Sequence, residues 1–163
     1  MNHFTRLDLE INFDIDKRLL ERKYLACLGQ FHPDKFVNKS NKEKLQAASD
    51  SVVINDAYKI LKSDLLRAQY IMSLYGFVIG SENDNVKASQ QVLSEALADR
   101  QKLEETSSKT DLQALLLAIN TEIKSSISTF VGLLKAGKLP EAACEVIRLR
   151  YKDKFLRDVE MRL

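Results

Sequence analysis

The chain has 163 residues, of which 45% are hydrophobic and 29% are charged, and its formal net charge is +2. This composition supplies enough apolar material for one or two modest cores, and it excludes a disordered or collagen-like chain. The small net charge gives no argument for a nucleic-acid-binding protein. No apolar run approaches the roughly 20 residues that a membrane span needs. We therefore expect a cytoplasmic protein that binds neither nucleic acid nor membrane.

The first half is predicted to contain two long helices joined as an antiparallel hairpin. Apolar residues recur every three or four positions over about residues 16–31, which indicates one face of a helix. Pro33 ends this helix, because its ring disfavours the helical conformation in the residue before it. After a loop over residues 35–40, a second helix is expected over about 41–61, with Ser40 or Asn41 as the candidate N-cap. Its apolar set includes Leu45, Val52, Ile54, Ala57 and Leu61. Two helices of similar length and a short connection favour a hairpin.

Shorter helices are expected on both sides of this hairpin. One or two helical turns at residues 4–9 precede it, and a helix over residues 65–74 follows it. Gly76 is placed to stop that helix. The polar string from Gly76 to residue 85 holds two of the five glycines and is typical of a linker.

The second half shows three more helical patterns, over about residues 86–105, 111–136 and 140–162. Gly137 ends the second of them, and Pro140 lies where a first helical turn tolerates proline. No segment shows the alternation of a strand. The sequence therefore predicts an all-α protein in which residues 1–76 form one helical domain, 77–85 a linker and 86–163 a three-helix bundle.

Metal and cofactor sites are not expected. Cys27 and Cys144 are the only cysteines, and they lie too far apart for a zinc motif with His3 or His32. A disulfide-stabilised scaffold of this size would need more cysteines. We expect two buried free thiols in a reducing compartment.

The tripeptide His32-Pro33-Asp34 concentrates the most unusual local chemistry of the chain. His32 and Asp34 could form an acid–base pair, but the sequence shows no nucleophile motif, phosphate-binding loop or carboxylate cluster to accompany them. Spacing alone favours an ordinary helix-ending turn. A docking loop is the third interpretation.

Four cations flank this tripeptide in sequence, and they bear on the docking interpretation. Arg18 and Arg22 lie one helical turn apart, Lys23 follows, and Lys35 comes directly after the tripeptide. A solvated helix face is the usual reason for such a pattern. The alternative is an electropositive surface that attracts an acidic partner.

The first half resembles a J-domain, the module of the DnaJ class of co-chaperones. The tripeptide occurs where a helical hairpin would turn, after a basic helix that ends at Phe31 and before a run that would pack against that helix. The whole chain further resembles the HscB family of J-domain co-chaperones for iron–sulfur cluster assembly. The matching segments are Phe4-x-x-Leu7, Phe13-Asp14-Ile15-Asp16, Lys35-Phe36, Ile54-Asn55-Asp56-Ala57-Tyr58-Lys59-Ile60-Leu61, Leu66-Arg67-Ala68-x-Tyr70, Leu74-Tyr75-Gly76-Phe77, Leu97-x-x-Arg100 and Leu149-Arg150-Tyr151-x-Asp153-Lys154.

The resemblance implies a function for the tripeptide. In this family the J-domain stimulates the ATPase of a DnaK-type chaperone, of the HscA class where that exists. His32, Pro33 and Asp34 would dock on the chaperone, and the four flanking cations would supply the basic surface. The protein itself would perform no catalysis and need no cofactor, and we expect it in the bacterial cytoplasm.

The resemblance also implies a client site in the second half, where the family binds an IscU-type scaffold protein. The matching positions are Val92, Leu93, Leu97, Arg100 and Tyr151. Periodicity alone instead favours core positions for Leu93 and Leu97.

The client site also departs from the family's pattern. Ser94, Ala98 and Gln101 stand where family members often have methionine and acidic residues. The runner-up hypothesis is therefore a J-domain co-chaperone with a different client.

Overall fold

The computed structural model describes residues 1–163 and contains seven α-helices, one 3-10 helix and no strand. The predicted all-α class is confirmed. The chain divides into two compact units, Met1–Tyr70 and Ile71–Leu163, each of which is described separately below. Their elements are α1 (His3–Arg6), α2 (Lys17–Gln30), η1 (Pro33–Phe36), α3 (Asn41–Lys62), α4 (Asp64–Leu74), α5 (Gln90–Glu105), α6 (Lys109–Lys135) and α7 (Leu139–Glu160).

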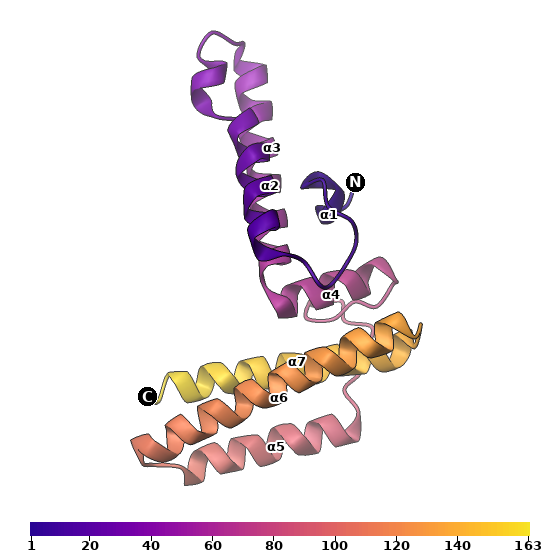
Figure 1. The fold of residues 1–163 in the computed structure, drawn as a ribbon, viewed down its shortest axis with the longest axis vertical. Coiled ribbons are helices and arrows are strands. Elements are labelled where there is room, and N and C mark those ends of the chain that lie inside the picture. Colours follow the sequence, from indigo (N-terminus) through magenta and orange to yellow (C-terminus); the bar gives the residue numbers. More distant parts are fainter. The chain divides into compact units, whose positions relative to one another are not determined.

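The first unit is built on the predicted hairpin. Figure 1 shows α2 and α3 side by side, with η1 at the end where the chain turns. Side-chain caps explain where both helices begin: a carboxylate oxygen of Asp16 accepts from Arg18 N–H, and Ser40 and Glu43 form a reciprocal capping box. Short α1 packs against α3.

The turn of the hairpin differs from the predicted loop over residues 35–40. It opens as a short 3-10 helix in which Pro33 takes the first position. Proline suits that position because its fixed φ is helical and its missing N–H would have no helical partner. His32 before it is extended, with ψ of 134°, as a residue before proline prefers.

Apolar residues of α3 are buried only along part of its length. Ile54, Ala57 and Leu61 are in the core, whereas Leu45 and Val52, predicted on the same apolar face, are 72% and 58% exposed. Figure 1 shows α1 beside the hairpin away from η1. The end of α3 near η1 therefore lacks a helix that would cover it.

The second unit contains the predicted three-helix bundle. Its core includes one cluster drawn from α5, α6 and α7, namely Leu103, Leu112, Leu115, Ile119, Phe155 and Val159. Helix α5 begins at Gln90 instead of the predicted residue 86, because the Ser89 hydroxyl accepts from Val92 N–H and caps it there. Gly137 follows the end of α6 with a φ of +71°. Glycine suits this position because it has no Cβ to oppose a positive φ.

Buried polar side chains link α6 with α7. The Ser126 hydroxyl donates to the Glu145 carboxylate at 2.6 Å, and Glu145 also pairs with Arg148. Arg148 reaches across to Glu95 of α5 at 2.8 Å. No buried side-chain nitrogen or oxygen of the chain lacks a hydrogen-bond partner.

A second set of ion pairs joins all three helices at Lys152, whose side chain is 9% exposed. Its ammonium lies 2.6 Å from Asp99 of α5 and 2.6 Å from Glu122 of α6. Burial alone would lower the pKa of Lys152, but the hydrogen bonds to both carboxylates outweigh it, and the pKa is raised above its ordinary value.

The segment predicted as a linker is tied by its own hydrogen bonds. The Asn85 side chain accepts from Val78 N–H and donates to the Gly76 carbonyl, both at 2.8 Å. Asp84 accepts from Ser81 N–H at 2.6 Å, and this bond holds the pKa of Asp84 below its usual value. The compact units of the structure divide within α4, between Tyr70 and Ile71. The domain boundaries expected at 76/77 and 85/86 therefore remain predictions.

The two cysteines, Cys27 and Cys144, are free thiols, as predicted. Both are only partly buried, so the prediction of buried thiols was wrong on that point. The Cys27 thiol donates to the Arg6 carbonyl at 3.6 Å.

Candidate functional site

The side chains of His32 and Asp34 stand exposed at the tip of the hairpin. The His32 side chain is 61% exposed and that of Asp34 is 87% exposed. Asp34 N–H donates to Nδ1 of His32 at 3.3 Å, and the same ring nitrogen lies 3.5 Å from the Asp34 carboxylate. Pro33, between them, is also exposed. The tripeptide therefore presents three fixed, adjacent groups to the solvent.

This geometry favours a docking loop over an acid–base pair. Catalytic groups converge on a cavity where a substrate can be held. The hollow beside the tip is lined by Pro33 but by neither His32 nor Asp34. The two side chains point outward from a turn, as groups that contact a partner would.

The flanking cations are only partly available to a partner. Arg18, Arg22 and Lys35 are exposed. Lys23 is 34% exposed, and its ammonium is bonded to the Asp8 carboxylate. The hydrogen bond from Lys23 lowers the pKa of Asp8, whose own backbone has a φ of +52°.

The second predicted site forms a groove between α5 and α7. It has a volume of about 320 Å³ and is lined by Leu93, Leu97, Arg100 and Tyr151 among others. Leu93, Leu97 and Tyr151 are 49%, 67% and 37% exposed. The core positions that periodicity favours for the two leucines are therefore wrong, and both lie on the surface.

Val92 does not belong to this surface. Its side chain is 2% exposed and lies in the core of the second unit. It is one residue before Leu93, and neighbouring helical residues point about 100° apart, so the two cannot share a face. The prediction of a partner contact for Val92 is corrected accordingly. Ser94, Ala98 and Gln101 are exposed on the same helix and do not line the groove.

Sequence reasoning missed several residues that line the same groove. Phe155 forms part of its floor, and Lys154 and Asp158 extend it along α7. The signal was present in the spacing, because Lys154 follows Tyr151 by three residues and Asp158 follows Lys154 by four.

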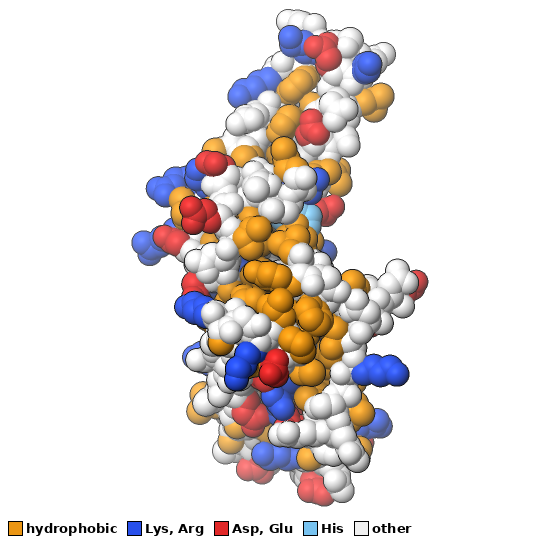
Figure 2. All heavy atoms as spheres, turned by 90° about the vertical axis from the view of Figure 1, so that its right-hand side faces the viewer, with side chains coloured by type: hydrophobic (Ala, Val, Ile, Leu, Met, Phe, Trp, Pro, Cys, Tyr) orange, Lys and Arg blue, Asp and Glu red, His pale blue; other side chains and the backbone are white.

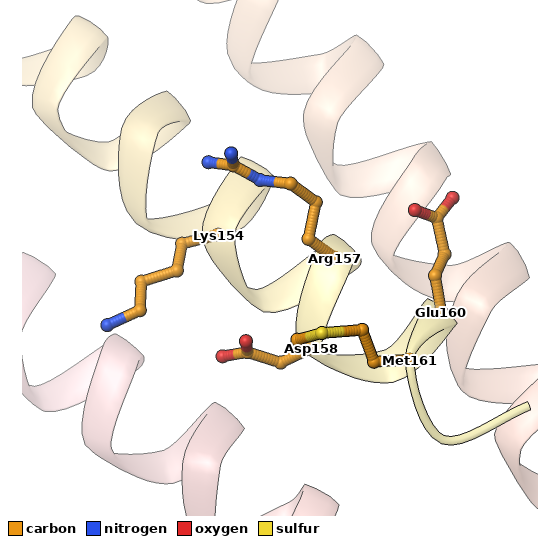
Figure 3. A pocket seen from close by; sticks show the side chains of 5 residues that line it. All are labelled: Lys154, Arg157, Asp158, Glu160 and Met161. Carbon is orange, nitrogen blue, oxygen red and sulfur yellow. The ribbon is translucent and has the colours of Figure 1, made fainter.

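A further hollow of about 610 Å³ lies at the C-terminal end of α7. Figure 3 shows its lining side chains, which are Lys154, Arg157, Asp158 and Glu160 of α7 and Met161 directly after it. Because α7 and the residue that follows it supply the whole lining, no second element holds these groups around a ligand. Nowhere in the chain do three or more His, Cys, Asp or Glu side chains gather as potential metal ligands. None of the helices combines the length and apolarity that crossing a membrane requires.

Comparison with known proteins identifies the family. Residues 88–160 match the family model described as the HSCB C-terminal oligomerisation domain. The co-chaperone protein HscB of Proteus mirabilis is 35% identical over 98% of this chain and 94% of its own length. The solved structure of chaperone HscB from Vibrio cholerae is 30% identical with a TM-score of 0.85, covering 99% of this chain and 96% of that one.

The fold agrees with a more distant relative as well. The crystal structure of the human co-chaperone protein HscB has a TM-score of 0.90 at 24% identity, over 99% of this chain and 82% of that one. The fold is accordingly a J-domain followed by a C-terminal helical bundle. With a relative 35% identical over nearly its whole length, this chain belongs to the HscB family of co-chaperones.

Proposed function

We propose that this protein docks on a DnaK/HscA-type chaperone through the hairpin tip and stimulates its ATPase. The observation that supports this most directly is the exposure of His32, Pro33 and Asp34 at the hairpin tip, with Arg18 and Arg22 also exposed along α2. Pro33 fixes the turn, and the Asp34 carboxylate offers an acceptor for an arginine of the partner. Stimulation then requires that the tip bind the hydrolysis-competent state of the chaperone more tightly than its other state.

The α5–α7 groove is proposed to bind an IscU-type scaffold protein. Three apolar side chains stand exposed there, and Arg100 lies at their edge. Exposed apolar groups that converge on a groove are typical of protein contacts. The protein would bring the scaffold to the chaperone in iron–sulfur cluster assembly, itself catalysing nothing and acting in the cytoplasm. The 77–85 segment would connect the J-domain of residues 1–76 with the scaffold-binding bundle.

A single-turnover ATPase assay tests the chaperone contact. We expect His32→Gln to reduce stimulation of a DnaK-type chaperone to the level measured without co-chaperone, because the substitution alters the exposed tip and no core contact. The matched control is His3→Gln, which changes the other histidine and should keep stimulation. Both variants are checked for folding by circular dichroism. Full stimulation by folded His32→Gln would rule out docking through the tip.

The client is tested separately, since the departures at Ser94, Ala98 and Gln101 support the alternative of a different client. Affinity capture from cell extract with the full chain as bait should recover the scaffold. Recovery of another protein without the scaffold would favour the alternative. Adding purified scaffold to the ATPase assay should raise stimulation further if the two sites act together.

A further inference from the structure

A second surface lies beside the tripeptide, on the α3 side of the hairpin tip. It is a hollow of about 620 Å³, here called the tip groove. Six of its eight lining residues are apolar: Phe31, Pro33, Phe36, Val37, Ala47 and Ala48. Lys44 and Ser51 complete it. Of the tripeptide, only Pro33 contributes, so the tip groove is a separate surface from the exposed face of His32 and Asp34.

The tip groove is open because this part of α3 has no covering helix. Val37 is 64% exposed, and Ala48 is exposed as well. Phe31 and Phe36 are only partly buried. Filling this hollow with an apolar group of a partner would remove these side chains from water, which favours binding.

The charge around the tip groove selects the kind of partner. Four exposed lysines, Lys35, Lys39, Lys42 and Lys44, occur within residues 34–44, where the acids are Glu43 and the exposed Asp34. The Glu43 carboxylate accepts from both the amide and the hydroxyl of Ser40, and these bonds lower its pKa. At the upper end of Figure 2, where Figure 1 places η1, hydrophobic side chains lie among cationic and acidic ones.

We propose that the tip groove binds an acidic peptide segment of a partner protein, one that sets an apolar side chain between carboxylates. The apolar side chain would fill the hollow between Phe36, Val37 and Ala48. The neighbouring carboxylates would approach Lys44 and the lysines of the turn, which favours acidic over basic segments. This inference goes beyond the ATPase contact proposed above, since apart from Pro33 and Lys35 it uses side chains that the chaperone contact does not.

The test uses the full chain labelled with nitrogen-15 and a short peptide with two leucines between pairs of glutamates. A peptide with lysines in place of the glutamates is the charge control. We expect the acidic peptide to shift amide resonances of the residues that line the tip groove, and the basic peptide to bind at least tenfold more weakly. Raising the salt concentration should weaken the acidic peptide's binding.

A matched pair of variants locates the contact. Val37→Asp places a carboxylate in the tip groove and should weaken binding of the acidic peptide at least tenfold. Val52→Asp makes the same change at a similarly exposed valine of α3 that does not line it, and should leave the affinity within about twofold. His32→Gln should also bind the peptide normally, which separates this inference from the ATPase proposal.

The inference would be overturned by no binding of the acidic peptide, by equal binding of the basic peptide, or by equal effects of the two valine substitutions. Chemical shifts confined to the α5–α7 groove would likewise reject the tip groove as the site.

Discussion

Arg67 is a buried cation whose partners hold the first unit together. The residue is 4% exposed. Its guanidinium donates to the Phe13 carbonyl at 2.8 Å, to the Leu61 carbonyl at 2.6 Å and to Asp64 at 2.7 Å. It also lies over the Phe13 ring, 4.4 Å from the centroid. One side chain thus connects the end of α3, the start of α4 and the segment before α2.

Replacing Arg67 by lysine should therefore destabilise the protein by about 2–4 kcal/mol, because a lysine cannot reproduce the fork that serves three acceptors at once. Urea unfolding followed by circular dichroism measures the change. Arg22→Lys, at an exposed position of α2, is the control and should change the free energy of unfolding by less than about 0.5 kcal/mol. A similarly small change for Arg67→Lys would show that its buried hydrogen bonds contribute little.

Asp8 restricts one cation of the proposed chaperone surface. Its carboxylate holds Lys23, the only one of the four flanking cations in a salt bridge. Asp8→Asn keeps a residue that tolerates positive φ and removes the charge. We expect about a twofold lower co-chaperone concentration for half-maximal ATPase stimulation, because Lys23 becomes available to an acidic partner.

Glu10→Gln is the control for that experiment, since it removes a nearby exposed charge that forms no salt bridge. It should leave the half-maximal concentration unchanged. An unchanged or higher concentration with Asp8→Asn would mean that Lys23 takes no part in docking.

At the scale of the element, helix ends were more predictable than helix faces. Local sequence limited each N-cap of the hairpin to two neighbouring candidates, Asp14 or Asp16 and Ser40 or Asn41, because an N-cap needs only its own side chain and the next turn. Asp16 and Ser40 are the caps in the structure. Ser89 was overlooked as the cap of α5, although the same chemistry applies. Leu45 and Val52 were placed on a buried face incorrectly, since periodicity shows that a helix is amphipathic but not how far its neighbours extend.

Lys152 joins three helices, and its contribution to stability should depend on pH. We expect Lys152→Met to destabilise the protein at pH 7 by about 1–3 kcal/mol, because Asp99 and the half-exposed Glu122 lose their shared partner. Since the folded-state pKa of Lys152 is raised, its contribution is complete below the ordinary lysine pKa of about 10.4 and is lost as the pH rises through the folded value.

The measurement is urea unfolding of wild type and Lys152→Met at pH 7 and at pH 11. The difference between the two proteins should shrink at the higher pH. Lys154→Met, at an exposed position two residues along the same helix, serves as the control and should show a small, pH-independent difference. A difference that grows with pH would contradict the role assigned to the Lys152 charge.

At the scale of the whole molecule, the proposed function assigns chaperone docking and client binding to different units. Replacing Leu93, Leu97 and Tyr151 together by alanine should therefore weaken scaffold binding at least tenfold by calorimetry and leave basal ATPase stimulation unchanged. All three side chains are substantially exposed, so the bundle core stays intact.

Light scattering belongs with this experiment, because the description of the matching family model names oligomerisation. If the molecular mass of the triple variant differed from that of the wild type, the lost binding would be assigned to altered self-association. Unchanged scaffold affinity in a folded variant would remove the α5–α7 groove from the proposal.

The sequence was sufficient for the fold class, the hairpin and the family, because these follow from periodicity, caps and motifs that lie close together in the chain. The α5–α7 groove was only partly predictable. Val92 and Leu93 are adjacent apolar residues, and their sequence does not tell which one is buried. Only the packing of α5 on α7 shows that Val92 is buried and Leu93 is exposed. Arg67 was within a recognised motif, yet two of its acceptors are backbone carbonyls that no residue type reveals.

The ion pairs of Lys152 and Arg148 also fix the register of the bundle. Leucine-rich helices can pack in more than one alignment, since a slip of one turn, about 5.4 Å, brings another apolar set into contact. Such a slip of α7 would carry Lys152 away from both Asp99 and Glu122 and would leave Glu145 buried without Ser126. Misaligned bundles would thus contain unpaired buried charges, and the charged network restricts the chain to one alignment in which α5 and α7 form the groove.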